Sequence, residues 1–169
     1  MSKTLVIMRH GKSTWDYEHV SDIDRPLKES GIANSLMIAQ KLKEKNLLPQ
    51  LILSSHAVRA LHTATIVARQ LGCSEAYIRI NPLIYSSETN ELLQLIKDTD
   101  DSCKTLFIFG HNPTFTMLAN LFLRDPIAEL PTSGTVILGF NSQSWKEISA
   151  HNKTSEEMLF PKLLNNTAN

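Results

Sequence analysis

Short apolar runs alternate with longer amphipathic segments along this chain. The run Thr4–Met8 is β-branched or apolar throughout, which predicts a strand buried on both faces near the centre of a sheet. Further strands are expected at residues 51–53, 77–80, 105–109 and 136–140, and apolar residues at helical spacing occur within 29–45, 61–71, 87–98 and 113–122. Strands that feed helices in this order predict an α/β layer structure.

The segment 29–45 is expected to form a helix. Its apolar residues Ile32, Leu36, Ala39 and Leu42 recur at intervals of four, three and three, which places them on one face. We expect that face to be buried and the lysines near the end of the segment to face water.

The C-terminal third is expected to close with a hairpin. Residues 136–140 and 145–149 are two candidate strands separated by a polar stretch of four residues. After His151 the composition becomes polar, which predicts a loosely held tail. We therefore expect one domain over residues 1–150 and a polar tail over 151–169.

Length and charge exclude several classes of protein. With 169 residues the prior is one domain, and 17 basic residues balance 17 acidic ones, so no global field would attract nucleic acid or an anionic membrane. The run Leu5–Met8 is far too short to span a bilayer or to form a signal-peptide core. A cytoplasmic location is expected, where Cys73 and Cys103 would remain thiols.

Three predicted strands end in unusual polar residues. The first is followed by Arg9-His10-Gly11, the second by a stretch that contains Ser54-Ser55 and Arg59, and the strand at 105–109 by Gly110-His111-Asn112-Pro113. Each motif alone is typical of a solvated loop, and a helical arginine commonly only covers apolar surface. The carboxyl ends of parallel strands, however, form the ligand crevice of open α/β sheets. The joint occurrence therefore indicates a site.

Histidine and arginine at such a site point to phosphoryl chemistry. An imidazole is largely unprotonated near neutral pH, because its reference pKa is about 6.5, so His10 is a competent nucleophile. The guanidinium groups of Arg9 and Arg59 match the oxygens of a phosphoryl group in a two-pronged geometry that a lysine cannot provide. Asn112 is expected to cap the helix that follows it.

The motifs resemble those of a known family. Arg9-His10-Gly11, Ser54-Ser55-x-x-x-Arg59-Ala60-x-x-Thr63-Ala64 and Gly110-His111-Asn112-Pro113 resemble the histidine phosphatase superfamily, and Asp24-Arg25-Pro26-Leu27-x-x-x-Gly31 resembles its SixA-type phosphohistidine phosphatases. The resemblance extends from about Leu5 to Ser149. It implies a three-layer α/β sandwich with a central, mostly parallel sheet and helices on both faces. It also implies no metal, no cofactor and a covalent phosphohistidine intermediate on His10.

The resemblance assigns roles to four further residues. Arg9 and Arg59 would bind the phosphoryl group, and His111 would face His10 either as a further donor to phosphate or as a proton carrier. Arg25 would lie at the rim of the pocket, although a surface ion pair with a neighbouring aspartate is an equally good interpretation. Lys28 stands where family members often have a serine or threonine as helix cap.

The expected substrate depends on whether the chain supplies a general acid that protonates the leaving group. Other branches of the superfamily carry an acidic residue between the second and third motifs, whereas here Glu88 and Glu91 are better interpreted as first-turn helix residues. Imidazole leaves phosphorus readily once protonated, which favours phosphohistidine on a signalling or phosphocarrier protein, unless a loop residue such as Asp16 supplies the acid. The alternatives are a phosphomonoesterase for small phosphoesters and a non-catalytic phosphate-recognition module. A receiver-type signalling domain is set aside, because the strand-end aspartates that it requires are replaced here by Arg9 and His111.

Other polar and aromatic residues receive structural interpretations. His56 and His62 flank Arg59, but no carboxylate or cysteine completes a familiar ligand spacing, so no metal site is expected. Trp15 is expected to pack near the entrance of the pocket. The segment 132–134 is expected either to approach the pocket or to form a turn.

Overall fold

The centre of the fold is a six-stranded sheet, which we describe from a computed structural model of residues 2–166. The strand order is β3-β2-β4-β1-β5-β6. The first four strands in this order run parallel, and β5 is antiparallel to both of its neighbours. The strand bounds are β1 Lys3–Arg9, β2 Leu51–Ser54, β3 Ile78–Ile80, β4 Thr105–Gly110, β5 Thr135–Phe140 and β6 Lys153–Leu159.

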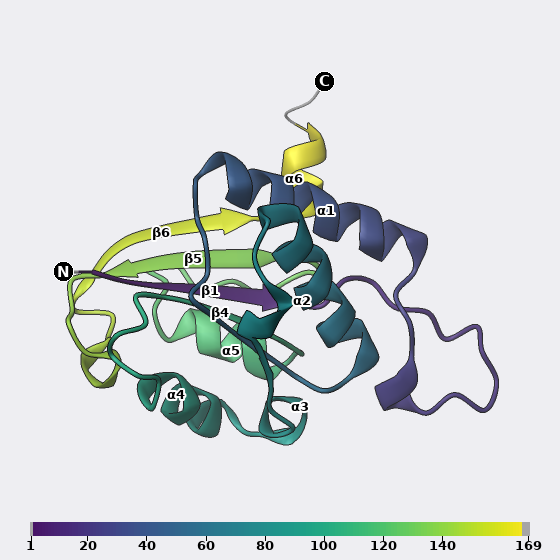
Figure 1. The fold of residues 1–169 in the computed structure, drawn as a ribbon, viewed down its shortest axis with the longest axis horizontal. Helices are drawn as coiled ribbons and strands as arrows, with labels where there is room; N and C mark the ends of the chain where they lie inside the picture. The colour runs from purple at the N-terminus through teal and green to yellow at the C-terminus, as the bar shows by residue number, and fades with distance from the viewer. Residues whose placement is uncertain (1, 167–169) are drawn as a thin grey trace.

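Helices cover both faces of this sheet (Figure 1). Helices α1 (Glu29–Glu44), α2 (Val58–Leu71) and α6 (Pro161–Asn166) lie on one side, and α3 (Leu83–Ser86), α4 (Thr89–Lys97) and α5 (Thr114–Asn120) lie on the other. Short 3-10 turns are formed by Asp22–Asp24, Glu75–Tyr77 and Trp145–Glu147. The predicted three-layer α/β sandwich with a mostly parallel sheet is confirmed.

The central position of β1 explains its uninterrupted apolar sequence. Leu5 and Ile7 belong to the core between the sheet and α4/α5, whereas Val6 and Met8 belong to the core beneath α1 and α2. Successive side chains of a strand point to opposite faces, so a strand covered on both sides must be apolar at every position. The two faces of this strand therefore hold the two layers of helices in place.

The buried face of helix α1 agrees with the predicted one only in part. Ala39 and Leu42 are buried as predicted, whereas Leu36 is 42% exposed, and Ser35 and Ile38 are also buried. The Ser35 hydroxyl hydrogen-bonds the hydroxyl of Ser133 at 3.0 Å, so a polar residue belongs to the buried face. Periodicity of apolar residues alone therefore placed Leu36 wrongly.

The predicted hairpin is wrong in its second strand. Residues 153–159 form β6, which pairs with β5, and residues 145–147 form a 3-10 turn. The indole of Trp145 is fully buried, and its Nε1–H donates to the carbonyl oxygen of Cys103 at 2.7 Å. Most side chains of β6 are exposed, since it is an edge strand, and its polar sequence therefore lacked the apolar pattern of a strand.

The predicted loose tail after His151 is also wrong for the described residues up to 166, which contain a strand and a helix. Helix α6 follows β6, and Leu164 packs against the core beneath α1 and α2. Residues 167–169 of the expected tail lie outside the described residues. Within residues 2–166, none of the helices combines the length and apolar character required to cross a bilayer.

Candidate active site

The three polar motifs meet at one end of the sheet because β2, β4 and β1 are adjacent strands that run in the same direction. Their side chains line a pocket of about 360 Å³. All five predicted site residues line this pocket: Arg9, His10, Arg25, Arg59 and His111. The other lining residues are Lys12, Ser13, Trp15, Asn112 and Thr132. The structure thus brings together residues up to about 100 positions apart.

The backbone of His10 is held from both sides by neighbouring segments. Its N–H donates to the carbonyl of Gly110 at 3.1 Å, and its own carbonyl accepts from the N–H of Ser133 at 3.0 Å. The next N–H, of Gly11, donates to the hydroxyl of Thr63 on α2 at 2.9 Å. These bonds fix the histidine relative to β4, β5 and α2.

The hydrogen bonds of the His10 ring determine which nitrogen is available. Nδ1 lies 2.7 Å from the carbonyl oxygen of Gly11, which can only accept, so Nδ1 carries the proton. Nε2 then presents a lone pair, toward which the Nε–H of Arg59 donates at 3.3 Å. The carbonyl that selects the tautomer, which the sequence did not show, is that of Gly11.

Arg59 lies in the first turn of α2 and is buried. Its Nη1 donates to the backbone oxygen of Asp22 at 2.6 Å, and its Nη2 donates to the carboxylate of Asp22 at 3.0 Å. The outer edge of the guanidinium group is therefore engaged with Asp22, while its Nε side faces His10. The orientation of Arg59 depends on a residue from a different part of the chain.

Arg9 ends strand β1 and uses only part of its donor set. Its Nη1 donates to the carbonyl of Leu130 at 3.0 Å and to the carboxylate of Glu129 at 3.2 Å. Its Nε is buried and has no hydrogen-bond partner among the described residues. Burial lowers the pKa of this guanidinium, and Glu129 opposes that effect. Arg9 thus has a buried donor that no group of the described residues satisfies.

His111 faces His10, with ring centroids 5.1 Å apart. Its Nε2 lies 2.8 Å from the hydroxyl of Ser55, and that hydroxyl oxygen already accepts from the N–H of Ala57. When the Ser55 hydroxyl donates to Nε2, the ring proton of His111 lies on Nδ1. Nδ1 is buried and has no partner among the described residues, so in this tautomer it is an unsatisfied donor.

Both histidines are held neutral. Burial, assisted by Arg59 and Arg9, lowers the pKa of His10 to about 4. Burial, assisted by His10 and Arg59, lowers the pKa of His111 to about 3. The His10 ring is therefore unprotonated, as a nucleophile must be, across the neutral range.

A pH titration tests this arrangement. In the folded protein both rings should remain neutral as the pH falls through about 6.5, where a free imidazole titrates. Because the unfolded chain binds these protons first, the two rings do not affect stability above pH 6.5, and they lower it progressively as the pH falls to about 4 for His10 and about 3 for His111. NMR titration of the ring Cε1–H signals, with urea unfolding at several pH values, measures both effects. Midpoints near 6.5 for His10 and His111 would contradict the structure.

Arg25 combines the two roles proposed for it from the sequence. It lines the pocket, and its Nε also donates to the carboxylate of Asp22 at 3.0 Å. Its Nη1 donates to the hydroxyl of Ser13 at 2.7 Å, and its guanidinium carbon lies 3.5 Å from the centre of the exposed Trp15 ring. The ion pair is therefore part of the pocket wall.

Two residues of the site had no motif to indicate them. The carboxylate of Asp22 accepts from Arg59, from Arg25 and, at 2.6 Å, from the hydroxyl of Tyr85. The ring of Tyr85 also contacts that of His111 edge-on at 5.3 Å. These donors hold the pKa of Asp22 at about 2, with the Tyr85 hydroxyl making the largest contribution. The only local signal was the three-residue spacing from Asp22 to Arg25.

Several further expectations are resolved by the structure. Glu88 and Glu91 form a capping box at the start of α4, as predicted for first-turn residues. Asn112 accepts from the N–H of Thr116 in the first turn of α5, and Lys28 precedes α1 without a side-chain cap. Thr132 lines the pocket, so the segment 132–134 approaches it.

The fold and the site together define the class of protein: an α/β protein with a mostly parallel sheet, whose strand ends gather arginine and histidine side chains in one pocket. A family model described as the histidine phosphatase superfamily (branch 1) matches residues 5–82. An uncharacterised chloroplastic protein of Arabidopsis thaliana is 34% identical over 158 residues, which cover 89% of this chain and 72% of that protein. The chain belongs to the histidine phosphatase superfamily.

Solved structures place the fold among SixA-type proteins. The protein assigned as the phosphohistidine phosphatase SixA of Agrobacterium tumefaciens is 25% identical, with a TM-score of 0.79 over 94% of this chain and 98% of that one. The protein histidine phosphatase SixA complexed with tungstate is 22% identical, with a TM-score of 0.78 over 95% and 99%. A 2,3-bisphosphoglycerate-dependent phosphoglycerate mutase of Bifidobacterium longum is 40% identical, but over only 39% of this chain and 28% of the mutase.

Proposed function

We propose that this protein is a metal-independent phosphatase that removes the phosphoryl group from phosphohistidine on a partner protein by way of a phosphorylated His10. The observation that carries the proposal is the His10 ring: Nδ1 is tied to the Gly11 carbonyl, so the lone pair lies on Nε2, which accepts from the Nε–H of Arg59. Around it, Arg9 and His111 hold buried donors without partners among the described residues. Such donors are what a transferring phosphoryl group requires.

The reaction would proceed in two displacements. The Nε–H of Arg59 first shifts its hydrogen bond from Nε2 of His10 to a phosphoryl oxygen. Nε2 then attacks phosphorus and a new N–P bond forms, while the bond from phosphorus to the substrate imidazole nitrogen breaks and that nitrogen takes up a proton from solvent. Water then attacks the phosphorylated His10, and its oxygen bonds to phosphorus as the N–P bond breaks. Inorganic phosphate leaves, one water proton passes to solvent, and the neutral ring is restored. Arg9, Arg59 and His111 stabilise the charge on the phosphoryl oxygens throughout.

The carboxylates near the pocket favour a substrate whose leaving group needs little help. Expulsion of an alkoxide from a phosphoester normally requires a general acid. Asp22 is ionised, with a pKa of about 2, and accepts hydrogen bonds from three side chains, so it holds no proton to donate at neutral pH. Glu88 and Glu91 are engaged in the cap of α4. Imidazole, by contrast, departs readily once protonated.

A substrate panel assayed in the presence of EDTA tests the substrate and the independence of metal together. We expect turnover of a phosphohistidine-bearing phosphocarrier protein to persist with the chelator. Its kcat/KM should exceed those for phosphoserine, sugar phosphates and nucleotides by at least about tenfold, equivalent to about 1.4 kcal/mol of barrier.

Each contrary result has a defined meaning. Loss of activity with EDTA that is restored by a divalent metal would overturn metal independence. A preference for small phosphoesters would replace the substrate with the one suggested by the similarity to phosphoglycerate mutases over part of the chain. Binding of vanadate or phosphate without any turnover would favour the non-catalytic recognition module.

A further inference from the structure

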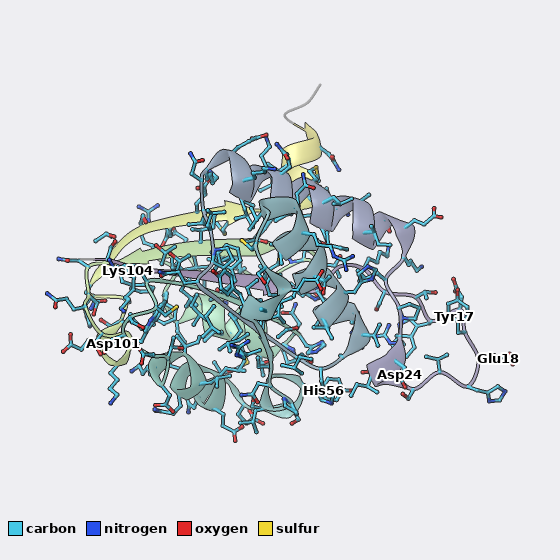
Figure 2. The ribbon with its side chains drawn as sticks, in the orientation of Figure 1. Tyr17, Glu18, Asp24, His56, Asp101 and Lys104 are labelled. Atoms are coloured by element: carbon cyan, nitrogen blue, oxygen red, sulfur yellow. The ribbon has the colours of Figure 1, made fainter. Side chains whose placement is uncertain are left out.

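We propose that Asp22 is a positioning residue of this site: it holds Arg59 so that its Nε–H points at the nucleophilic nitrogen of His10. This inference rests on the proposed function and extends it to a residue outside the three motifs. The connection between β1 and α1 that contains Asp22 projects beyond the strand ends, with Tyr17 and Glu18 near its tip and Asp24 nearer the body of the protein (Figure 2).

The contacts between Asp22 and Arg59 constrain the guanidinium group from its outer edge. Nη1 donates to the backbone oxygen of Asp22 and Nη2 to its carboxylate, so one residue engages both terminal nitrogens. A planar guanidinium fixed at both terminal nitrogens has little freedom to rotate. The remaining nitrogen, Nε, is thereby directed at Nε2 of His10.

Asp22 is itself held by two other parts of the chain. The hydroxyl of Tyr85 on α3 donates to the same carboxylate oxygen that Arg59 contacts, and Arg25 donates to the other. The carboxylate therefore links the β1–α1 connection, α2 and α3. Since it also contacts Arg25, it orients two of the three arginines that line the pocket.

The negative charge of Asp22 indicates that this residue serves to position Arg59 and not to attract phosphate. An ionised carboxylate next to the arginines of a phosphate pocket repels the phosphate and weakens its binding. A role limited to electrostatics would therefore make Asp22 unfavourable for an anion-binding site. Its benefit must come from the geometry of Arg59, and misplacement of a transition-state donor by about 1 Å can cost on the order of 100-fold in rate.

The positioning role predicts opposite effects on binding and on rate. In the full-length chain, Asp22→Asn removes the negative charge but keeps the size of the side chain. We expect kcat for the phosphohistidine protein to fall by about 10- to 100-fold. The Kd for inorganic phosphate, measured by calorimetry, should be unchanged or tighter, since a repulsive charge is lost. The matched control is Asp24→Asn, which removes the same charge from the same turn, where the carboxylate of Asp24 accepts from the hydroxyl of Ser21 at 2.7 Å.

Two further measurements separate positioning from a loss of folding. Tyr85→Phe keeps the ring that contacts His111 but removes the donor to Asp22, and it should reduce kcat in the same direction by a smaller factor. In a double-mutant cycle, Asp22→Asn should cost little more once Arg59 has been changed to lysine, because the two residues act as a unit. Thermal unfolding of each variant checks that it is folded.

An NMR readout tests the inference without turnover. In the wild type, the Nε–H of Arg59 should give a resolved, slowly exchanging signal, assigned by its disappearance in Arg59→Lys. That signal should shift and broaden in Asp22→Asn but not in Asp24→Asn. An unchanged signal, an unchanged kcat in a folded Asp22→Asn protein, or full additivity in the cycle would each overturn the positioning role. If the wild type itself hydrolyses no phosphorylated compound, the proposed function fails, while the NMR comparison still decides the role of Asp22.

Discussion

Replacing His10 with alanine should abolish turnover and the covalent intermediate together. The lone pair of Nε2 of His10 lies beside Arg59, whereas Nε2 of His111 lies against the hydroxyl of Ser55, so we expect the phosphoryl group to be transferred to His10. Wild-type protein incubated with a radiolabelled phosphohistidine substrate and quenched rapidly should carry label in an acid-labile, base-stable linkage. His10→Ala should carry none and show no hydrolysis above background.

The matched control for this substitution is His62→Ala. His62 is exposed on α2, three residues after Arg59, so its removal also deletes one histidine without disturbing the pocket. His62→Ala should label and turn over like the wild type. If a folded His10→Ala protein retained full activity, or if it still acquired the acid-labile label, the nucleophile would have to be sought elsewhere.

Changing Arg59 to lysine should lower kcat by about 10²–10³-fold, in line with the loss of one oxyanion donor in other enzymes. Lysine keeps the charge but has a single nitrogen, which cannot engage Asp22 and face Nε2 of His10 at the same time. The effect should be mainly on kcat, because the remaining charge still attracts the phosphoryl group.

The control for Arg59→Lys is Arg69→Lys, which makes the same charge-conserving substitution on the same helix. Arg69 is exposed at the far end of α2 and pairs with Glu75, remote from the pocket. Steady-state kinetics of both variants should show wild-type behaviour for Arg69→Lys. Equal activity in Arg59→Lys would mean that a point charge suffices and that the two-pronged geometry of Arg59 is not used in the transition state.

The architecture and most of the pocket were predictable because their signals are local. The apolar run of β1, the alternation of strands and helices, and three motifs at strand ends are each read within a few residues. Since adjacent parallel strands end at the same edge, the motifs had to converge once the strands paired. The strand order and the local motifs were therefore enough to predict that Arg9, His10, Arg59 and His111 lie at the same edge of the sheet.

The features that escaped prediction depend on contacts between distant residues. Asp22 joins the site through Arg59 and Tyr85, which lie 37 and 63 positions away, so its neighbours in sequence suggested only a surface ion pair. Strand β6 is recognised by its pairing with β5 and not by an apolar pattern. Similarly, the orientation of α1 depends on the contact between Ser35 and Ser133, which polar sequence patterns do not reveal.

The outer and inner parts of the β1–α1 connection differ in their contacts, and this difference matters for protein engineering. Its outer part, near Tyr17 and Glu18, lies away from the body of the protein, whereas Asp22 and Arg25 at its inner end are bonded into the pocket. A graft confined to residues 16–20 leaves the hydrogen bonds of Asp22 with Arg25 and Arg59 in place. A graft that extends through residue 22 removes the carboxylate that aligns these two arginines.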